Sequence, residues 1–304
     1  MEKYKSGFVT LLGRPNVGKS TLINKLIGKK ITITSPIAQT TRNKLRGILT
    51  TKESQIIFID TPGLHKPHHL LGEALVKNAK SAVKGVDLVL LVFDSSEQPG
   101  RGDTYIKDFL IKTNSEFIVV LNKWDTVNAD CKKQREIMYR ELFFGKKVSF
   151  FNVSALNGDG CNKLIRSIND CLPNGPMLYP DDIICDQPLN ILLAELVREQ
   201  VLLNTREEIP HSVAVQIEKI QEIKRDNGKC FTIVMASIIV ERKSQKGIII
   251  GKNGSMLKEI GQSARINMKK LIDGAVHLEL FVKVIPNWRK KASKVSEFGY
   301  EDKS

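Results

Sequence analysis

The sequence has few cysteines and no long apolar run. Its five cysteines are an odd number without C-x-x-C spacing, which indicates neither a disulfide framework nor a zinc site and fits a reducing cytoplasm. No apolar stretch approaches the roughly 18 residues of a membrane span, so we expect none. The chain begins Met-Glu-Lys-Tyr-Lys-Ser and soon enters a predicted strand, so we expect no signal or transit peptide.

Length and net charge indicate how many domains the chain forms and what kind of partner it binds. A chain of 304 residues that is 41% hydrophobic predicts about two packed domains. The net charge of +14 indicates an anionic partner, either nucleic acid or a lipid surface. Between Arg242 and Lys294 there are 13 Lys and Arg against three Asp and Glu, so the strongest basic region lies near the end of the chain.

A glycine-rich loop follows the apolar run that ends at Leu12. It matches the pattern G-x-x-x-x-G-K-[ST] and precedes residues that are apolar at helical spacing. The pattern predicts a phosphate site: glycines let backbone N–H groups point at an anion, Lys19 reaches the β- and γ-phosphates, and the Ser20 hydroxyl is a Mg²⁺ ligand. The predicted nucleotide contacts here are Gly13, Arg14, Pro15, Asn16, Val17, Gly18, Lys19, Ser20 and Thr21.

Asn122-Lys123-Trp124-Asp125 follows a second apolar run, which predicts a buried parallel strand whose carboxyl end faces a ligand. A carboxylate there can accept both hydrogen bonds from the N1–H and N2–H₂ edge of guanine, which adenine cannot offer. We therefore expect Asp125 to select guanine, with Asn122 and Lys123 beside it. Ser154, Ala155 and Leu156 follow another predicted strand and are expected to offer a backbone N–H to the guanine O6.

Asp60-Thr61-Pro62-Gly63 follows a third apolar run and predicts a γ-phosphate sensor. Asp60 would hold Mg²⁺ and the Gly63 N–H would contact the γ-phosphate. The polar loop around Thr40 and Thr41 is expected to supply one further Mg²⁺ ligand when GTP is bound, and which threonine does so stays open.

Strand and helix patterns alternate up to residue 172, which predicts an α/β fold with a doubly wound sheet and a GTPase domain at residues 1–172. Residues 173–187, which begin with the turn-forming stretch Pro-Asn-Gly-Pro, are expected to be a linker. Residues 188–304 have the order helix, strand, strand, helix, helix, strand, which predicts a smaller α+β domain.

A G-x-x-G loop lies between the last two predicted helices. In KH domains such a loop clamps the backbone of about four nucleotides beside an apolar groove, because glycines allow phosphates close to the main chain. The position of this loop in the most basic region predicts a type II KH domain that binds RNA. The expected RNA contacts are Lys246, Ile250, Gly251, Lys252, Asn253, Gly254, Lys258 and Arg265.

The wording of these motifs resembles the Era family of GTPases, and the resemblance covers nearly the whole chain. Gly-Arg-Pro-Asn-Val-Gly-Lys-Ser-Thr, Ala-Gln-Thr-Thr-Arg, Asp-Thr-Pro-Gly-Leu-His and Asn-Lys-Trp-Asp carry it in the first domain, and Val-Ile-Pro-Asn-Trp-Arg in the second. It implies Mg²⁺-dependent GTP hydrolysis in which Lys19, Thr41 and Gly63 act. It also implies binding near the 3′ end of small-subunit ribosomal RNA during assembly of the 30S particle.

One position departs from many GTPases. Leu64 stands where a glutamine often orients the attacking water, so we expect slow intrinsic hydrolysis. In related GTPases an asparagine at the place of Asn16 helps to hold a monovalent cation, so we expect K⁺ there.

These patterns favour a cytoplasmic, monomeric GTPase switch that couples nucleotide state to RNA binding. A P-loop kinase is a rival interpretation, but Asn122–Asp125 favours guanine and no acceptor motif occurs. The second rival interpretation is a GTPase at the cytoplasmic membrane surface, held to anionic lipid by its basic C-terminal part. Peripheral membrane contact can coexist with RNA binding.

Overall fold

The computed structural model describes residues 4–35, 45–60, 83, 85–205, 209–224, 230–272 and 274–298. The chain divides into two compact units. The first comprises residues 1–34 and 38–186, and the second comprises residues 35–37 and 187–304.

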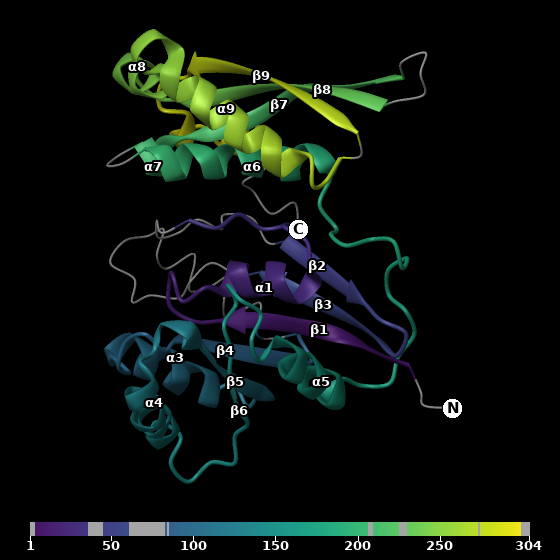
Figure 1. Cartoon of the computed structure of the whole chain (residues 1–304), viewed down its shortest axis with the longest axis vertical. Helices are drawn as coiled ribbons and strands as arrows, with labels where there is room; N and C mark the ends of the chain where they lie inside the picture. Colours follow the sequence, from purple (N-terminus) through teal and green to yellow (C-terminus); the bar gives the residue numbers. More distant parts are fainter. Residues whose placement is uncertain are drawn as a thin grey trace. The chain divides into compact units, whose positions relative to one another are not determined.

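A six-stranded sheet forms the centre of the first unit (Figure 1). Its order is β2-β3-β1-β4-β5-β6, and the neighbouring strands from β3 to β6 are parallel. The strands are β1 (Lys5–Leu12), β2 (Leu45–Thr50), β3 (Ser54–Asp60), β4 (Leu88–Asp94), β5 (Phe117–Asn122) and β6 (Phe150–Asn152). β2 runs antiparallel to β3, because the three residues between them are too few for a crossover.

Helices cover both faces of this sheet. The helices are α1 (Lys19–Ile27), α3 (Arg101–Ile111), α4 (Ala129–Glu141) and α5 (Cys161–Cys171), with a 3₁₀ turn η1 (Trp124–Thr126). α1 contacts β2, β3 and α5, whereas α3 and α4 contribute Ile106, Leu110 and Tyr139 to a core cluster with strands β1, β4 and β5. The predicted doubly wound α/β fold is confirmed. The last strand is shorter than the predicted Val148–Val153, as is common at a sheet edge.

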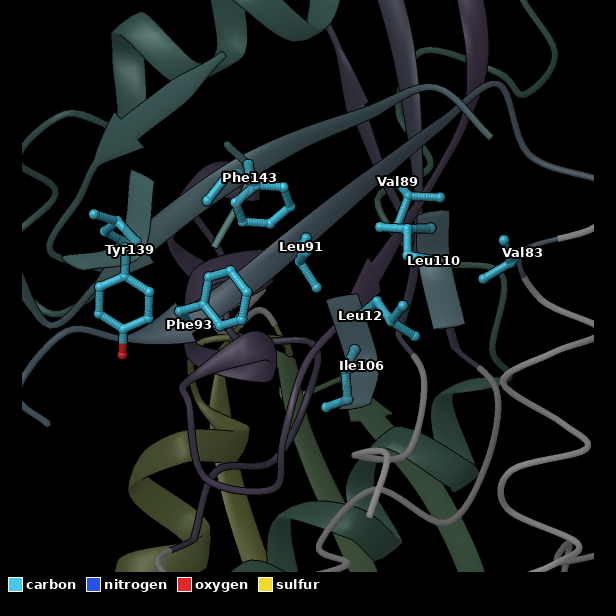
Figure 2. Close-up of a cluster of buried hydrophobic side chains, with 11 residues drawn as sticks. Leu12, Val83, Val89, Leu91, Phe93, Ile106, Leu110, Tyr139 and Phe143 are labelled. Carbon is cyan, nitrogen blue, oxygen red and sulfur yellow. The ribbon is translucent and has the colours of Figure 1, made fainter. Parts of the chain in front are cut away.

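Aromatic side chains fill the core beside β4, whose seven residues are all buried. Phe93 packs against Tyr139 with ring centroids 5.1 Å apart, and Phe143 packs edge-on against Phe93 (Figure 2). The Tyr139 hydroxyl donates to the carbonyl oxygen of Asp94 at 2.8 Å. This cluster therefore fixes α4 against the carboxyl end of β4.

The segment predicted as a linker hydrogen-bonds to the first unit. Ile48 N–H donates to the carbonyl oxygen of Ile184 at 2.9 Å, and Asp186 N–H donates to that of Arg46 at 3.2 Å. The Asp186 carboxylate accepts the Arg46 N–H at 3.1 Å. Residues 184–186 thus cover the outer edge of β2, which would otherwise expose unpaired backbone groups.

The second unit has a three-stranded sheet with helices α6 and α9 beside one another along it (Figure 1). β8 is central, antiparallel to β7 and parallel to β9. The elements are α6 (Leu189–Asn204), α7 (Ile209–Ser212), β7 (Ala214–Lys224), β8 (Cys230–Val240), α8 (Lys243–Ile250), η2 (Lys252–Gly254), α9 (Ser255–Met268), β9 (Ala275–Val284), η3 (Trp288–Lys290) and α10 (Ala292–Glu297). The parallel pair β8 and β9 is joined by α8 and α9, as a parallel connection requires.

The end of the described chain packs back onto this sheet. Trp288 is buried against Ala214, Ile239 and Phe298, and its indole N–H donates to the carbonyl oxygen of Ser212 at 2.9 Å. The Val-Ile-Pro-Asn-Trp-Arg motif therefore has a structural role in the second unit.

Adjacent phenylalanines offer a matched test of the first core. Phe143 is 3% exposed and Phe144 is 94% exposed. We expect Phe143→Ala to lower the free energy of unfolding of the first unit by about 3–5 kcal/mol, because it leaves a cavity. Phe144→Ala should change it by less than about 0.5 kcal/mol. Hydrogen exchange of the β4 amides measures both, and equal effects would contradict the packing described.

Candidate functional site

The loop between β1 and α1 has the left-handed backbone that a phosphate cradle requires. Asn16 has φ 65° and Gly18 has φ 92°. A Cβ on Gly18 would lie 2.4 Å from the Asn122 amide nitrogen, and one on Gly13 would lie 2.4 Å from the Val92 carbonyl oxygen. Side chains at these two positions would therefore break the loop. The loop ends at the N-terminus of α1, where the helix dipole favours an anion.

Lys19 lies inside the loop that precedes it. Its ammonium group donates to the carbonyl oxygens of Gly13 at 3.2 Å and Arg14 at 2.9 Å, and the residue is 7% exposed. Burial lowers the pKa of Lys19 to about 8, against the opposing attraction of the Asp60 carboxylate. A buried cation whose hydrogen bonds in this loop go to neutral carbonyl oxygens is well prepared to receive a phosphate.

The two described residues predicted as Mg²⁺ ligands lie together. The Ser20 hydroxyl donates to Asp60 Oδ2 at 2.9 Å, and Asp60 is fully buried at the carboxyl end of β3. One hydroxyl and one carboxylate suit Mg²⁺, which takes its remaining ligands from water and substrate phosphates. The other predicted contacts, Thr40, Thr41, Thr61, Pro62 and Gly63, lie outside the described residues, as does Leu64.

Asn122 connects three of the predicted motifs. Its amide nitrogen donates to the carbonyl oxygen of Val17 at 2.8 Å, and its amide oxygen accepts the N–H of Ala155 at 3.0 Å. The side chain is 1% exposed, so both bonds are protected from water. Asn122 therefore fixes the phosphate loop and the Ser154–Leu156 loop relative to β5.

The remaining residues predicted to contact guanine lie in η1 and in the Ser154–Leu156 loop. Asp125 lies in η1 and its side chain is exposed, as a carboxylate that receives a base must be. Ser154 N–H donates to the carbonyl oxygen of Asp159 at 3.0 Å, which shapes the loop that carries Ala155 and the exposed Leu156. The expected O6 contact from this loop stays a prediction.

Asp94, which no sequence pattern indicated as a site residue, lies at the carboxyl end of β4. The Lys123 ammonium group donates to Asp94 Oδ2. Burial raises the pKa of the Asp94 carboxyl, but hydrogen bonds from Lys123 and Ser96 outweigh it and hold that pKa below its usual value. The next residue, Ser95, also connects the end of β4 to the guanine motif, because its N–H and hydroxyl both donate to the carbonyl oxygen of Asn122. The available signal was the position of Asp94, directly after the apolar run Leu88–Phe93.

In the second unit, the G-x-x-G segment also needs its glycines. Gly251 has φ 71°, and a Cβ there would lie 2.7 Å from the Met256 Cβ and 2.9 Å from its nitrogen. Asn253 has φ 52° and Gly254 has φ 78°, so the chain turns sharply between α8 and α9. The side chains of Lys252 and Asn253 are exposed at this turn.

A groove of about 430 Å³ lies beside this turn, between α9 and β9. Leu257 and Gly261 of α9 and Leu278 and Leu280 of β9 contribute apolar lining. Three predicted RNA contacts also line it, namely Gly254, Lys258 and Arg265. The remaining predicted contacts, Lys246, Ile250, Gly251, Lys252 and Asn253, lie in α8 and the turn before α9. Sequence analysis missed the β9 lining, which includes His277.

No described helix is long and apolar enough to cross a membrane. Within the described ranges, no group of three or more His, Cys, Asp or Glu side chains could hold a metal ion.

The chain was compared with known proteins. Residues 8–123 match the family described as 50S ribosome-binding GTPase, and residues 208–289 match the KH domain. The whole chain is 53% identical over 300 residues to GTPase Era of Rippkaea orientalis, and the match covers 99% of this chain and 94% of the relative. It is 54% identical over 301 residues to GTPase Era of Crocosphaera subtropica, covering 98% and 93%.

Two solved structures resemble it over nearly the whole length. One is Era in complex with MgGDPNP and nucleotides 1506–1542 of 16S ribosomal RNA, with a TM-score of 0.88, 40% identity and coverage of 98% of this chain and 99% of that chain. The other is an Era variant of Aquifex aeolicus bound to GDP·AlF4⁻, with a TM-score of 0.87, 39% identity and coverage of 97% and 99%.

Removal of the Asn122 amide tests the connection between the motifs. We expect Asn122→Ala to weaken GDP binding at least tenfold, because the Val17 carbonyl and the Ala155 N–H lose buried partners that are worth about 1–3 kcal/mol each. Isothermal titration measures the affinity. Asn162→Ala, at an exposed position of α5, is the matched control and should bind GDP as the parent does. Equal affinities would show that the amide does not organise the site.

Proposed function

Because the chain belongs to the Era family of GTPases, we propose that it is a GTP-driven switch that binds small-subunit ribosomal RNA near its 3′ end and assists assembly of the 30S particle. The observation that carries this proposal is the likeness, over 98% of the chain, to Era in complex with MgGDPNP and a 16S ribosomal RNA segment. The phosphate loop and the groove beside Gly251–Gly254 supply the two sites that such a switch requires.

The first unit would hold GTP through groups that are already in position. The N–H groups of the loop before α1 and the Lys19 ammonium group donate to the phosphates, and Lys19 stabilises the charge that develops during hydrolysis. Asp125 accepts the N1–H and N2–H₂ donors of guanine. Ser20 and Asp60 would hold Mg²⁺, which neutralises phosphate charge when bound. Thr41 and Gly63 would complete the site around the γ-phosphate.

Intrinsic hydrolysis should be slow, since Leu64 offers no polar atom to a water molecule. A K⁺ ion beside Asn16 would supply part of the missing charge stabilisation. Equal hydrolysis rates in K⁺ and Na⁺ would remove this part of the proposal.

RNA would bind in the groove between α9 and β9. The glycines of the turn let a sugar–phosphate backbone approach the main chain, and Lys258 and Arg265 attract phosphates. The apolar side chains of Leu257, Leu278 and Leu280 can receive unstacked bases. Polyanionic RNA thus accounts for the basic end of the chain. An anionic membrane is the rival partner of this surface. The proposed function, as a cytoplasmic monomer that binds RNA, does not require membrane binding.

The β2 edge offers a route from nucleotide state to RNA binding. β2 begins four residues after Thr41 in the sequence, and its edge is bonded to Ile184 and Asp186. α6, the first helix of the second unit, starts three residues after Asp186. A change in the loop on GTP hydrolysis would therefore reach the start of the second unit through few bonds.

The RNA site has a charge-reversal test. We expect Lys252→Glu to weaken binding to the 3′-terminal segment of small-subunit ribosomal RNA more than tenfold and to leave GTP hydrolysis unchanged, because the lysine lies at the turn that would clamp the backbone. Lys146→Glu makes the same charge change at an exposed turn of the first unit and should bind RNA normally. Filter binding measures both. Undiminished RNA binding by Lys252→Glu, together with lost binding to phosphatidylglycerol vesicles, would favour the membrane interpretation.

The route along β2 has its own test. Asp186→Ala removes the carboxylate that accepts the Arg46 N–H and pairs with its guanidinium group at 3.7 Å. We expect the ratio of RNA affinities in the GTP and GDP states to move at least threefold toward one, while the affinity for GDP stays the same. Asp181→Ala, exposed on the same segment, should keep the parental ratio. An unchanged ratio in Asp186→Ala would exclude this route.

A further inference from the structure

We propose that Arg14 is a positioning residue, whose side chain lies in a slot at the start of α3 and thereby fixes the carbonyl oxygens that hold Lys19. This inference rests on the proposed nucleotide site. It assigns a role to a side chain that the phosphate-loop pattern leaves unspecified, since Arg14 occupies one of its variable positions.

A fully buried carboxylate holds one side of this slot. Arg14 Nε donates to Asp103 Oδ1 at 2.7 Å, and the Asp103 side chain is 0% exposed. The other carboxylate oxygen accepts the N–H of Gly100 at 2.9 Å and so caps α3. A second ion pair, from Arg14 to Glu97, is 3.4 Å long and more exposed. Because Asp103 is buried, loss of the guanidinium would leave its charge without a cation.

On its other side the slot is bounded by Gly102, which has no side chain to fill it. A Cβ on Gly102 would lie 2.7 Å from Arg14 Cδ. Gly102 is the second residue of α3, and glycine is a poorer helix former than alanine. Its φ lies outside the left-handed region, so the backbone itself does not require glycine. The need to leave space for the Arg14 side chain explains why residue 102 is glycine.

The backbone of Arg14 connects the slot to the phosphates. The Lys19 ammonium group donates to the Arg14 carbonyl oxygen at 2.9 Å and to that of Gly13 at 3.2 Å. The Arg14 side chain is bonded to α3, so these carbonyls have a fixed position relative to the helix. A shift of Arg14 would move Lys19 away from the place where charge develops on the phosphates, and small displacements of such groups cost rate.

Gly102→Ala separates this positioning role from a purely structural one. Alanine favours the helix, which opposes the cost of shifting Arg14 against the buried Asp103, so thermal stability should fall less in Gly102→Ala than in Arg14→Ala. The added methyl group displaces the Arg14 side chain, and we expect kcat for GTP to fall about tenfold while KM and the affinity for GDP change less than threefold. Arg14→Ala should lower kcat at least as much, and Arg14→Lys, which keeps a cation near Asp103, should retain more activity than Arg14→Ala. Arg101→Ala, exposed in the same helix, should match the parent.

Steady-state hydrolysis by the full chain at a series of GTP concentrations gives kcat and KM, and GDP titration counts the active sites. An unchanged kcat in Gly102→Ala and Arg14→Ala would overturn the inference, as would a loss of thermal stability in Arg14→Ala without a change in kcat. If the parent protein itself neither bound nor hydrolysed GTP, the proposed function would fail first, so the two failures are distinguishable.

Discussion

The buried amide of Asn122 is the interaction on which the nucleotide site depends. The phosphate loop follows β1, the guanine motif follows β5, and the Ser154–Leu156 loop follows β6, so no local pattern holds them together. Parallel strands bring their carboxyl ends to one edge of the sheet, which places the loops near one another but leaves their orientation undetermined. Two hydrogen bonds from a side chain that is 1% exposed determine it. The same amide lies where a Cβ of Gly18 would have to be, so the glycine and the asparagine depend on each other.

The segment after β4 extends this organisation to the other side of the site. Asp94 pairs with Lys123, Ser95 bonds to Asn122, and Asp103 pairs with Arg14. Each of these carboxylates is largely or wholly removed from water and would be costly without its cation. The segment between β4 and α3 is thus bonded both to the phosphate loop and to the guanine motif. Tyr139 donates to the Asp94 carbonyl oxygen, which ties this segment to the aromatic core as well.

Much of this molecule was predictable because its chemistry is local in sequence. The strand, glycine loop and helix around Gly13–Thr21 carry their own signal, and the order of apolar runs gave the α/β fold and its second, smaller domain. The partners of Arg14 and Lys123 were not predictable, since they lie 89 and 29 residues away and any surface carboxylate could have served. For the same reason the pairing of β2 with residues 184–186 was missed. A segment with several prolines predicts a linker, and edge pairing between residues 140 apart leaves no periodic pattern.

The pairing of β2 with residues 184–186 bears on how much energy a switch of this kind needs. An allosteric coupling of 1–3 kcal/mol changes an affinity by about 5- to 150-fold, which is the scale of a few hydrogen bonds. The β2 edge has backbone bonds from Ile48 and Asp186 and a carboxylate bond to Arg46, all next to the loop expected to respond to the γ-phosphate. Such an edge can break or form as a unit because antiparallel backbone pairs reinforce one another. The proposed route along β2 would therefore need only a short edge pairing to change.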